Sequence, residues 1–418
     1  MKIAVIGAGA AGLVCARELL RAGHEVTIFE QSATLGGVWV HTPEVESDRL
    51  GRAPTRRVFA SLYDSLRTNL PRDLMAFRDY SFDSRGGGRD EWPQYPDHTQ
   101  VLAYLRNFAE HFDIDRWIRF GETVVSLTPA DAGGWHIVTS RSGVHNFEGV
   151  AVCNGHYSVP RVPRIAHMEC FNGALLHSHN YRRPDEFRGR RVAVLGAAAS
   201  GADLAREIAT VAEQVYWFAR VAEGHPSLAS NVTVCSLPNT FAPNNSIRCA
   251  DGSLVADLDA VLFCTGYEYT FPFLDPDIVR VTDNWVHPLY LDIMAIEYPS
   301  LGFIGLPFMV FPFPLFEMQA RWFAQMLSGE VLLPPLTVRQ RIFEEHIAGL
   351  RQRGVPQHHF HKLAEQQFRY TDYLAAQCGA ESVPQWFKTL AAEAAENRMQ
   401  YPGSFRDIPL RSPKPESA

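Results

Sequence analysis

The sequence predicts an α/β fold in which two similar strand–glycine loop–helix units are combined, the second inserted into the first, with a helical C-terminal segment. Three observations carry this prediction. An apolar run at the N-terminus leads into a glycine-rich loop, the same pattern returns near residue 191, and the chain after about residue 316 is largely helical in character. With 418 residues and 46% hydrophobic composition, the chain can form two or more domains with large cores.

The first unit begins with the apolar run Ile3–Ile6, which predicts a buried strand because parallel strands are covered on both faces. The sequence GAGAAG follows, and then an Ala/Leu-rich run predicts a helix over 13–22. In such a loop the first glycine allows a tight turn, the second lets backbone approach a pyrophosphate, and the third lets helix pack on strand. The helix N-terminus offers free N–H groups to phosphate. We therefore predict a dinucleotide site at Gly7, Ala8, Gly9, Ala10, Ala11 and Gly12.

An acidic residue follows at the spacing that a dinucleotide site requires. The strand predicted at 25–29 ends in Glu30, whose carboxylate can accept hydrogen bonds from both ribose hydroxyls. Strand, glycines, helix and acid occur in the order of the dinucleotide fingerprint, whereas the alternative is a glycine-rich turn in another kind of α/β protein. Just beyond, Gly36 and Gly37 suit a loop pressed against an extended dinucleotide, with Trp39 flanking it.

A polar dipeptide is then held between leucines in the sequence LRTNLP, residues 66–71. Pro71 biases the residue before it toward extended geometry, so we expect Asn69 in a fixed, non-helical turn. The Asn69 amide can both donate and accept hydrogen bonds, and the alternative is that it only caps this turn. Farther along, we expect a helix over 99–112, short strands over 120–152 and a buried strand at 150–153.

The second unit repeats the pattern of the first. A strand at 191–195 precedes the glycine loop 196–201, a helix follows over 202–211, and a strand at 214–218 leads into Arg220. Arg220 stands where the first unit has an acid, and an arginine can bind a 2′-phosphate that an acid would repel. The first site is therefore expected to bind FAD and the second NADPH. Ala198 replaces the middle glycine, so a Rossmann-like unit without a ligand is the alternative here.

The chain then returns to the first unit. The sequence DAVLFCTGY, residues 259–267, predicts the strand that closes the second unit, and a strand at 301–305 and a helix over 316–327 belong to the first. We expect three segments: 1–159 as the first part of the FAD-binding domain, 160–286 as the NADP-binding domain, and 287–418 as the second part of the FAD-binding domain with C-terminal helices.

Composition excludes several classes of partner. A net charge of −7 without a basic run argues against nucleic acid or an anionic membrane as partner. The seven cysteines are scattered and never spaced C-x-x-C, which fits free thiols, and no segment has the length of a membrane span or the form of a signal peptide. We therefore expect a cytoplasmic protein. We interpret His358, His359 and His361 as a solvated face without partner carboxylates, and expect no metal site.

A resemblance to a known family rests on the sequence FNGALLHSHNY, residues 171–181. It matches the F-x-G-x-x-x-H-x-x-x-Y/F signature of the flavin-containing monooxygenases. The passages GAGAAG, LGGVW, LRTNLP, CNGHYSVP, HSHNYR, FCTGY and FEMQARW resemble the same family in the same order along the chain. They are most similar to the plant and insect members that oxygenate sulfur or amine nitrogen. Tyr181 stands where the related Baeyer–Villiger enzymes carry tryptophan.

The resemblance implies roles at particular positions. It assigns FAD binding to Gly7–Gly12, Glu30, Gln31, Gly37, Val38 and Trp39. It assigns NADPH binding to Ala199, Ser200, Gly201, Ala202 and Arg220. It also places Thr68 and Asn69 between nicotinamide and flavin, with Asn69 as the catalytic residue, and it makes His177 a structural residue of the link between domains.

The function that the resemblance implies is an NADPH- and O₂-dependent monooxygenase. Its C4a-hydroperoxyflavin would oxygenate a soft nucleophile, a thioether sulfur or an amine nitrogen, of a small molecule. Three alternatives remain: Baeyer–Villiger-type oxidation, a largely uncoupled NADPH oxidase or reductase, and a non-catalytic dinucleotide-binding protein. A disulfide reductase would need a redox dithiol, and the spacing of the cysteines offers none.

Overall fold

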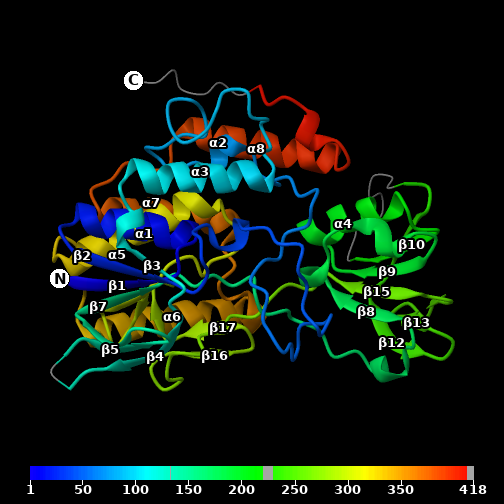
Figure 1. Ribbon diagram of the computed structural model, residues 1–418, viewed down its shortest axis with the longest axis horizontal. Coiled ribbons are helices and arrows are strands. Elements are labelled where there is room, and N and C mark those ends of the chain that lie inside the picture. The colour runs from blue at the N-terminus through cyan, green and yellow to red at the C-terminus, as the bar shows by residue number, and fades with distance from the viewer. Residues whose placement is uncertain (132, 220–228, 412–418) are drawn as a thin grey trace.

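The computed structural model describes residues 1–131, 133–219 and 229–411, and its mixed α/β architecture confirms the predicted fold class. Two units lie side by side (Figure 1). The larger contains the N-terminal strands and the C-terminal helices, and the smaller is built from the middle of the chain, coloured green. The smaller unit is thus inserted into the larger one, as predicted.

A seven-stranded sheet organises the larger unit, in the order β18-β19-β20-β7-β1-β2-β3. The interior strand β1 pairs in parallel with both β2 and β7, and the side chains of Ile3, Ala4 and Val5 are fully buried. Burial on both faces explains why this strand is a continuous apolar run. The strands are β1 (Lys2–Ile6), β2 (Glu25–Glu30), β3 (Ile118–Phe120), β7 (Gly149–Val152), β18 (Leu289–Tyr290), β19 (Met294–Ala295) and β20 (Leu301–Phe303).

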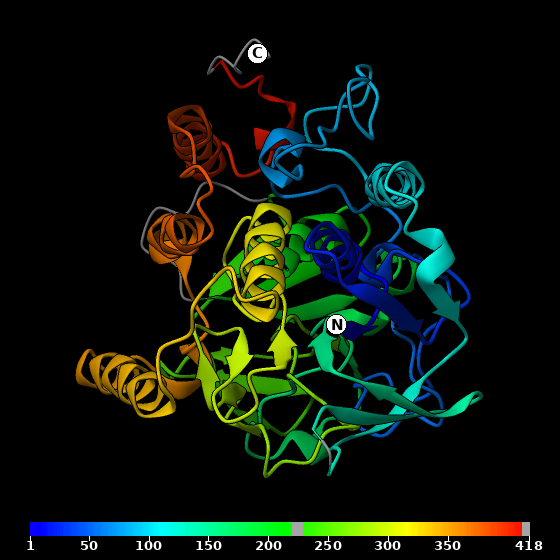
Figure 2. The same ribbon diagram turned by 90° about the vertical axis from the view of Figure 1, so that its left-hand side faces the viewer.

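The helices α1 (Ala10–Arg21) and α5 (Pro312–Leu327) pack side by side on this sheet (Figure 2). A buried ion cluster joins them: Arg17 of α1 is 2% exposed and lies 2.7 Å from Glu317 of α5. Asp79 and Glu18 lie 2.6 and 2.9 Å from the same guanidinium. Removing one partner of a buried pair leaves an uncompensated charge and costs ~3–5 kcal/mol, so this cluster fixes α5 against the helix of the first glycine loop.

The smaller unit is built on a five-stranded, all-parallel sheet in the order β11-β10-β9-β15-β8. Its strands are β8 (Ala174–His177), β9 (Arg191–Leu195), β10 (Gln214–Phe218), β11 (Val232–Cys235) and β15 (Ala260–Phe263). The helix α4 (Ala199–Ala209) follows β9 directly and packs on β9 and β10. This strand–loop–helix unit is therefore the second one that the sequence predicted.

The remaining strands form three small antiparallel sheets. They are formed by β4 (Val124–Pro129), β5 (Trp135–Thr139) and β6 (Gly143–Phe147), by β12 (Pro238–Ala242), β13 (Ser246–Cys249) and β14 (Leu254–Val255), and by β16 (Arg280–Thr282) and β17 (Trp285–His287). The first of these sheets confirms the short strands expected between residues 120 and 152.

The remaining helices are α2 (Arg72–Met75), α3 (His98–His111), α6 (Leu336–Gln352), α7 (Gln367–Gln377) and α8 (Gln385–Gln400), which confirms the helical character of the C-terminal segment. The helix α3 begins at a capping box, in which Asp97 accepts from the amides of Thr99 and Gln100. The helix α5 begins at Pro312, four residues before the predicted start at Phe316, because proline is accommodated in a first helical turn.

Candidate active site

The first glycine loop, between β1 and α1, is closed by contacts that only glycine permits. Gly7 has a φ of +105°, and a Cβ there would lie 2.6 Å from the carbonyl oxygen of Cys153 at the end of β7. A Cβ on Gly12 would lie 1.8 Å from the carbonyl oxygen of Gly7. The loop therefore turns sharply against β7, and α1 starts directly beside it without a side-chain cap. Its first N–H groups have no partner within the helix, and such a helix N-terminus is an arrangement that binds phosphate.

A second segment, residues 36–39, completes a narrow backbone cradle. The amide of Gly36 donates to the Ala8 carbonyl oxygen at 2.9 Å. A Cβ on Gly37, whose φ is +56°, would lie 2.9 Å from the Cα of Gly9. Two chain segments thus approach with bare backbone at the place where the sequence predicted an extended dinucleotide. Beyond them, the rings of Trp39 and Phe313 meet edge to face at 6.4 Å.

Glu30 ends β2, and the protein already orients its carboxylate. Oε2 accepts from the Ala8 amide at 2.8 Å, and Oε1 accepts from the amide and the hydroxyl of Ser32, each at 2.8 Å. The side chain is 7% exposed. A carboxylate has about four acceptor positions, so these three bonds leave one on Oε2 for a ribose hydroxyl. The bare backbone, the helix N-terminus and this held acid together fit a flavin dinucleotide.

The second glycine loop repeats the geometry of the first. Gly196 has a φ of +125°, and a Cβ there would lie 2.2 Å from the carbonyl oxygen of Cys264. A Cβ on Gly201 would lie 2.0 Å from the carbonyl oxygen of Gly196. The loop and β15 therefore meet as the first loop and β7 do, and Ala199, Ser200, Gly201 and Ala202 form the first turn of α4.

Ala198, the departure from the glycine pattern, takes its place without strain. Its φ and ψ are −76° and −178°, and the corresponding Gly9 has −79° and −174°. Both conformations are extended and open to any residue. The substitution therefore adds only a methyl group, which is exposed at the helix N-terminus. Arg220, the predicted reader of the 2′-phosphate, lies outside the described residues.

The turn that contains Asn69 is capped by its neighbour. The Thr68 side chain is 3% exposed, and its hydroxyl donates to the Leu70 carbonyl oxygen at 2.8 Å. The side-chain amide of Asn69 is partly exposed and makes no hydrogen bond with any residue that the structure describes. Leu70 and Trp39 pack against one hydrophobic cluster, which also includes Ala8 and Ala10. Within the part of the chain that the structure describes, the hydrogen-bonding capacity of the Asn69 amide is therefore not used by the turn.

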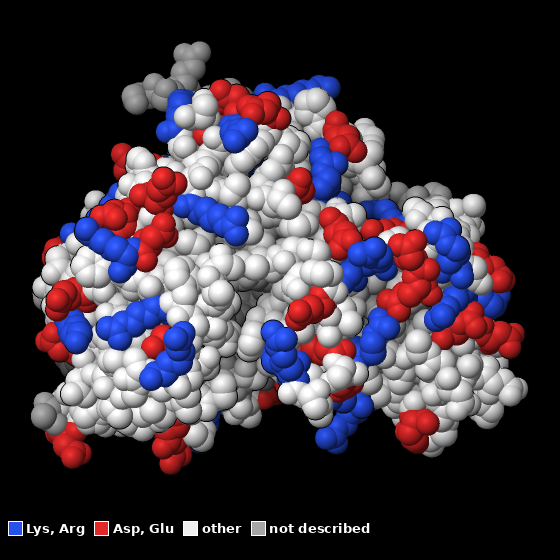
Figure 3. All heavy atoms as spheres, in the orientation of Figure 1, with Lys and Arg blue, Asp and Glu red and all other residues white. Residues whose placement is uncertain are grey.

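The segment 61–70 also reaches the second unit. The hydroxyl of Tyr63 donates to Asp203 at 3.2 Å, and the hydroxyl of Ser65 donates to Glu207 at 2.6 Å, both acceptors lying on α4. The structure thus links the segment before Asn69, in the larger unit, to the helix of the second glycine loop, in the smaller unit. On the face shown in Figure 3, a hollow lies between these units.

The signature segment 171–181 forms β8 and the short turn after it. His177 is fully buried, its amide donates to the Arg49 carbonyl oxygen at 2.9 Å, and its Nδ1 accepts from the His179 amide at 3.1 Å. Burial lowers the pKa of His177 to about 3, with the neighbouring His179 as a smaller cause. A neutral, fully packed imidazole supports a structural role for this residue.

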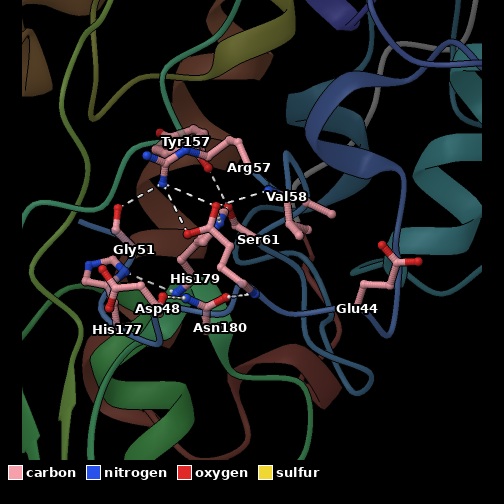
Figure 4. A network of polar contacts seen from close by, with 12 residues as sticks. Glu44, Asp48, Gly51, Arg57, Val58, Ser61, Tyr157, His177, His179 and Asn180 are labelled. Atoms are coloured by element: carbon pink, nitrogen blue, oxygen red, sulfur yellow. Dashed lines mark hydrogen bonds and ion pairs between the residues drawn. The ribbon is translucent and has the colours of Figure 1, made fainter. Parts of the chain in front are cut away.

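A buried polar network around His179 links this segment to residues 46–61 (Figure 4). Glu46 accepts from Arg57 at 3.1 Å and from the Val58 amide at 3.0 Å, and its carboxylate lies 3.4 Å from Nε2 of His179. Nδ1 of His179 lies 2.9 Å from the hydroxyl of Ser61, which donates to the Tyr157 carbonyl oxygen. Burial, followed by the charges of nearby arginines, lowers the pKa of His179 to about 4.

Arg182 is a second link of the same kind. It is 6% exposed, and its guanidinium donates to five backbone carbonyl oxygens, those of Thr42, Glu44, Ala60, His179 and Tyr181, at 2.7–3.1 Å. Sequence reasoning missed this residue and the network around Glu46, because isolated charges in a loop carry no local signal of burial. The motif HSHNYR, which ends in Arg182, was the one available indication.

The histidines near residue 360 differ from the expectation. His361 is 1% exposed, with Nδ1 3.0 Å from Asp292 and Nε2 accepting from the Val286 amide at 3.0 Å. His358 lies 3.4 Å from Asp283. The interpretation as a solvated face without carboxylates was therefore wrong, because both partners come from a segment about 75 residues earlier. Within residues 1–131, 133–219 and 229–411, no group of three or more His, Cys, Asp or Glu side chains is placed to hold a metal ion.

Comparison with known proteins identifies the family. Residues 1–225 and 224–390 match the family described as flavin-binding monooxygenase-like. This chain belongs to that family. FAD and NADPH are the cofactors of this monooxygenase, as the two glycine loops predicted, and a small molecule and O₂ are its substrates.

One relative and two solved structures extend over nearly the whole monooxygenase. Flavin-containing monooxygenase FMO GS-OX-like 3 of Arabidopsis thaliana is 38% identical over 97% of this chain and 93% of its own length. The structure of S-allyl-L-cysteine S-oxygenase from Allium sativum is also 38% identical, with a TM-score of 0.93 over 97% of this chain and 95% of that one. The structure of Tmm from Pelagibacter shares the fold, with a TM-score of 0.85 over 100% of this chain and 95% of that one at 24% identity.

In the part of the monooxygenase that the structure describes, no helix is both long and apolar enough to cross a membrane.

Proposed function

We propose that this monooxygenase transfers one oxygen atom from O₂ to the sulfur of a small thioether, with NADPH as the reductant. The observation that carries this proposal is the likeness to S-allyl-L-cysteine S-oxygenase, at 38% identity and a TM-score of 0.93. Both thioether sulfur and amine nitrogen are soft nucleophiles, and amines are the competing substrate class.

We assign FAD to the cradle of the larger unit, and bound FAD supplies the chemistry of oxygen transfer. The residues assigned are Gly7, Ala8, Gly9, Ala10, Ala11, Gly12, Glu30, Gln31, Gly37, Val38 and Trp39. The first N–H groups of α1 bind the pyrophosphate, and the free acceptor position of Glu30 binds a ribose hydroxyl. The bare backbone of Gly9 and Gly37 keeps side chains out of the cofactor's path.

We assign NADPH to the second loop, with Ala199, Ser200, Gly201 and Ala202 at the phosphates and Arg220 at the 2′-phosphate. Between the two sites, Thr68 holds the turn and Asn69 presents its amide to the reacting groups. An unpartnered amide can accept from the nicotinamide carboxamide and donate to the oxygen that is transferred. The hydroxyl of Thr68 supports this assignment, because it leaves Asn69 free of the capping role.

Two organisational proposals accompany this function. We place the domain boundaries so that 1–159 and 287–418 form the FAD-binding domain with the C-terminal helices, and 160–286 form the NADP-binding domain. The sheets support the central part of this division, since every strand of the five-stranded sheet lies between Ala174 and Phe263. Toward the second boundary, Phe273, Leu274 and Val286 pack in the core of the larger unit. We also propose the cytoplasm as the compartment, supported by the seven cysteines, all described and all free.

The test of the function uses the purified flavin-loaded protein. NADPH is added without oxygen, bleaching of the flavin absorbance is followed, and air is then admitted with a thioether, an amine or a ketone. We expect bleaching, and close to one sulfoxide per NADPH with the thioether. A product formed only from the amine would show that the enzyme oxygenates nitrogen, and a product formed only from the ketone would show Baeyer–Villiger-type oxidation. Peroxide without any oxygenated product would make it an oxidase, and failure to bleach would reject the proposal.

A further inference from the structure

Arg406, in the chain segment after α8, bridges the two units. Its Nη1 and Nη2 lie 3.1 and 2.5 Å from the carboxylate oxygens of Asp203 on α4. Its Nε donates to the carbonyl oxygen of Thr68 at 2.8 Å. One guanidinium therefore holds both the helix assigned to NADPH and the peptide that precedes Asn69. A planar guanidinium with donors on two sides suits this double contact, which the single ammonium of lysine cannot reproduce.

A reciprocal pair of contacts strengthens the attachment to the Asn69 turn. Arg67 donates to the Asp407 carboxylate at 2.8 Å and to the Arg406 carbonyl oxygen at 3.3 Å. Arg406 in turn donates to the Arg67 carbonyl oxygen at 3.5 Å. The two dipeptides 67–68 and 406–407 thus lie against each other through both side chains and backbone, although they are 338 residues or more apart in the chain.

The packing of the neighbouring Phe405 holds this segment in place independently of the ion pair between Arg406 and Asp203. The neighbouring ring of Phe405 is 4% exposed and meets the fully buried ring of Tyr95 edge to face at 5.4 Å. The side chains of Arg406 and Asp203 are each 16% exposed, so solvent screens their attraction less than that of a surface pair. Arg206 lies 3.5 Å from the same carboxylate. Asp203 therefore keeps a cationic neighbour when Arg406 is removed, and the variant should fold.

We propose that Arg406 is a positioning residue of the monooxygenase: it fixes the Asn69 turn relative to α4, so that the nicotinamide end of NADPH is held beside the Asn69 amide. This inference rests on the proposed function of Asn69 and of the second glycine loop. The bridge of Arg406, Asp203 and the Thr68 carbonyl is the contact through which the tail after α8 takes part in the reaction.

The experiment compares Arg406→Ala with the wild-type holoenzyme at equal flavin content. Two quantities are measured: the affinity for NADP⁺, from the change in flavin absorbance on titration, and the share of NADPH that appears as hydrogen peroxide rather than sulfoxide. We expect NADP⁺ to bind at least about fivefold more weakly, the lower end of couplings between protein sites, and the peroxide share to rise. FAD content and thermal stability should stay near the wild-type values.

Two further variants separate positioning from general stability. Asp203→Asn keeps the shape of the side chain and removes the charge that Arg406 binds, so it should repeat both changes. The double variant should show no larger peroxide share than the more affected single variant, because residues that act as one unit are not additive. Arg188→Ala is the matched control. It removes an arginine of the smaller unit whose partner Asp185, 3.2 Å away, lies in an exposed pair, and it should change neither the NADP⁺ affinity nor the peroxide share.

The outcomes distinguish this inference from the function on which it rests. If Arg406→Ala and Asp203→Asn keep wild-type NADP⁺ affinity and coupling while Asn69→Ala releases peroxide, the positioning role is rejected and the function stands. Loss of stability or flavin, with the surviving holoenzyme fully coupled, also rejects positioning. If the wild type makes no sulfoxide, the proposed function fails, and the NADP⁺ titration alone still accepts or rejects the bridge.

Discussion

Glu30 holds the first glycine loop from the end of the neighbouring strand, because its Oε2 accepts a hydrogen bond from the amide of Ala8 at 2.8 Å. The residue expected to bind a ribose therefore also holds in place the loop that we assign to the pyrophosphate. Its effect on flavin binding should exceed that of a single ribose contact, since losing it also frees Ala8 and Ser32.

For Glu30→Ala we expect protein that purifies largely without flavin and regains activity with excess FAD. Loss of hydrogen bonds to a charged group costs ~1.5–3 kcal/mol each, which is roughly ten- to a hundredfold in affinity. Flavin content after dialysis is the measurement. Glu30→Gln keeps the shape of the side chain and some of its acceptors. Its flavin content should therefore lie between those of the wild type and Glu30→Ala. Full flavin occupancy of the alanine variant through dilution would show that the ribose contact is misplaced.

For Asn69→Ala we expect normal FAD binding and normal reduction by NADPH, with oxygenated product replaced by hydrogen peroxide. The reason is that the free amide is assigned to the reacting groups, while the Thr68 hydroxyl keeps the turn in place. Product and peroxide per NADPH are measured on one flavin-loaded sample. Thr68→Val is the complementary variant. It removes the hydroxyl that donates to the Leu70 carbonyl oxygen, so its main effect should be a lower thermal stability. A fully coupled Asn69→Ala would reject the catalytic assignment.

For Arg220→Ala we expect NADPH to bind about ten- to a hundredfold more weakly and NADH to change little, because the lost contact is a charge-assisted hydrogen bond to the 2′-phosphate. The position lies outside the described residues, and this prediction rests on its place after β10 in the sequence. The ratio of kcat/KM for the two cofactors is the measurement. Equal losses for NADPH and NADH would mean that another residue reads the phosphate.

For Gly37→Ala we expect loss of flavin with a folded protein. The new Cβ would lie 2.9 Å from the Cα of Gly9, which forces the two segments of the cradle apart. Gly23→Ala is the control: its φ of +79° carries a similar conformational cost, roughly 1–2 kcal/mol, but nothing lies within 4 Å of its Cβ. If both variants lose flavin equally, backbone conformation and not the close approach explains the glycine at 37.

The buried histidines predict how stability depends on pH. Burial lowers the pKa of His177 to about 3 and of His179 to about 4, whereas an unfolded chain has a histidine pKa of about 6.5. The unfolded state therefore binds more protons below pH ~6.5, and each histidine removes up to ~1.4 kcal/mol of unfolding free energy per pH unit as the pH falls toward its folded pKa. Above pH ~6.5 both histidines are neutral in the folded and the unfolded state, so this loss of unfolding free energy is absent.

Urea unfolding between pH 7 and pH 4.5 measures this slope. His177→Gln removes one of the two titrating groups, so its free energy of unfolding should fall less steeply with decreasing pH than that of the wild type, although it starts lower at pH 7. An unchanged slope would mean that His177 is already charged in the folded protein.

The glycine loops could be predicted from the sequence because their constraints are local. Gly7 and Gly12, or Gly196 and Gly201, are five residues apart, and each pair meets through its own backbone. The acid at the end of β2 follows at a fixed distance along the chain for the same reason. Strands β9 and β10 were predicted with the bounds that the structure has, because a buried parallel strand is a continuous apolar run.

The contacts that connect the units could not be predicted in this way. Glu46 meets Asn180 across 134 residues, and Arg406 meets Thr68 across 338. A single charged residue in a loop has the same local sequence whether it faces solvent or a distant carboxylate. The same reason explains the wrong interpretation of His361, whose partner Asp292 is brought to it only by the fold.

The pairing of β7 with β20 joins strands that are synthesised far apart in time. The larger sheet lacks β18, β19 and β20 until residues 289–303 have left the ribosome. The five-stranded sheet, by contrast, is complete once residue 263 has emerged. Because domains generally fold as units during translation, we expect the sheet of the smaller unit to form before the larger sheet is complete. We therefore expect flavin to bind late in the synthesis of the chain.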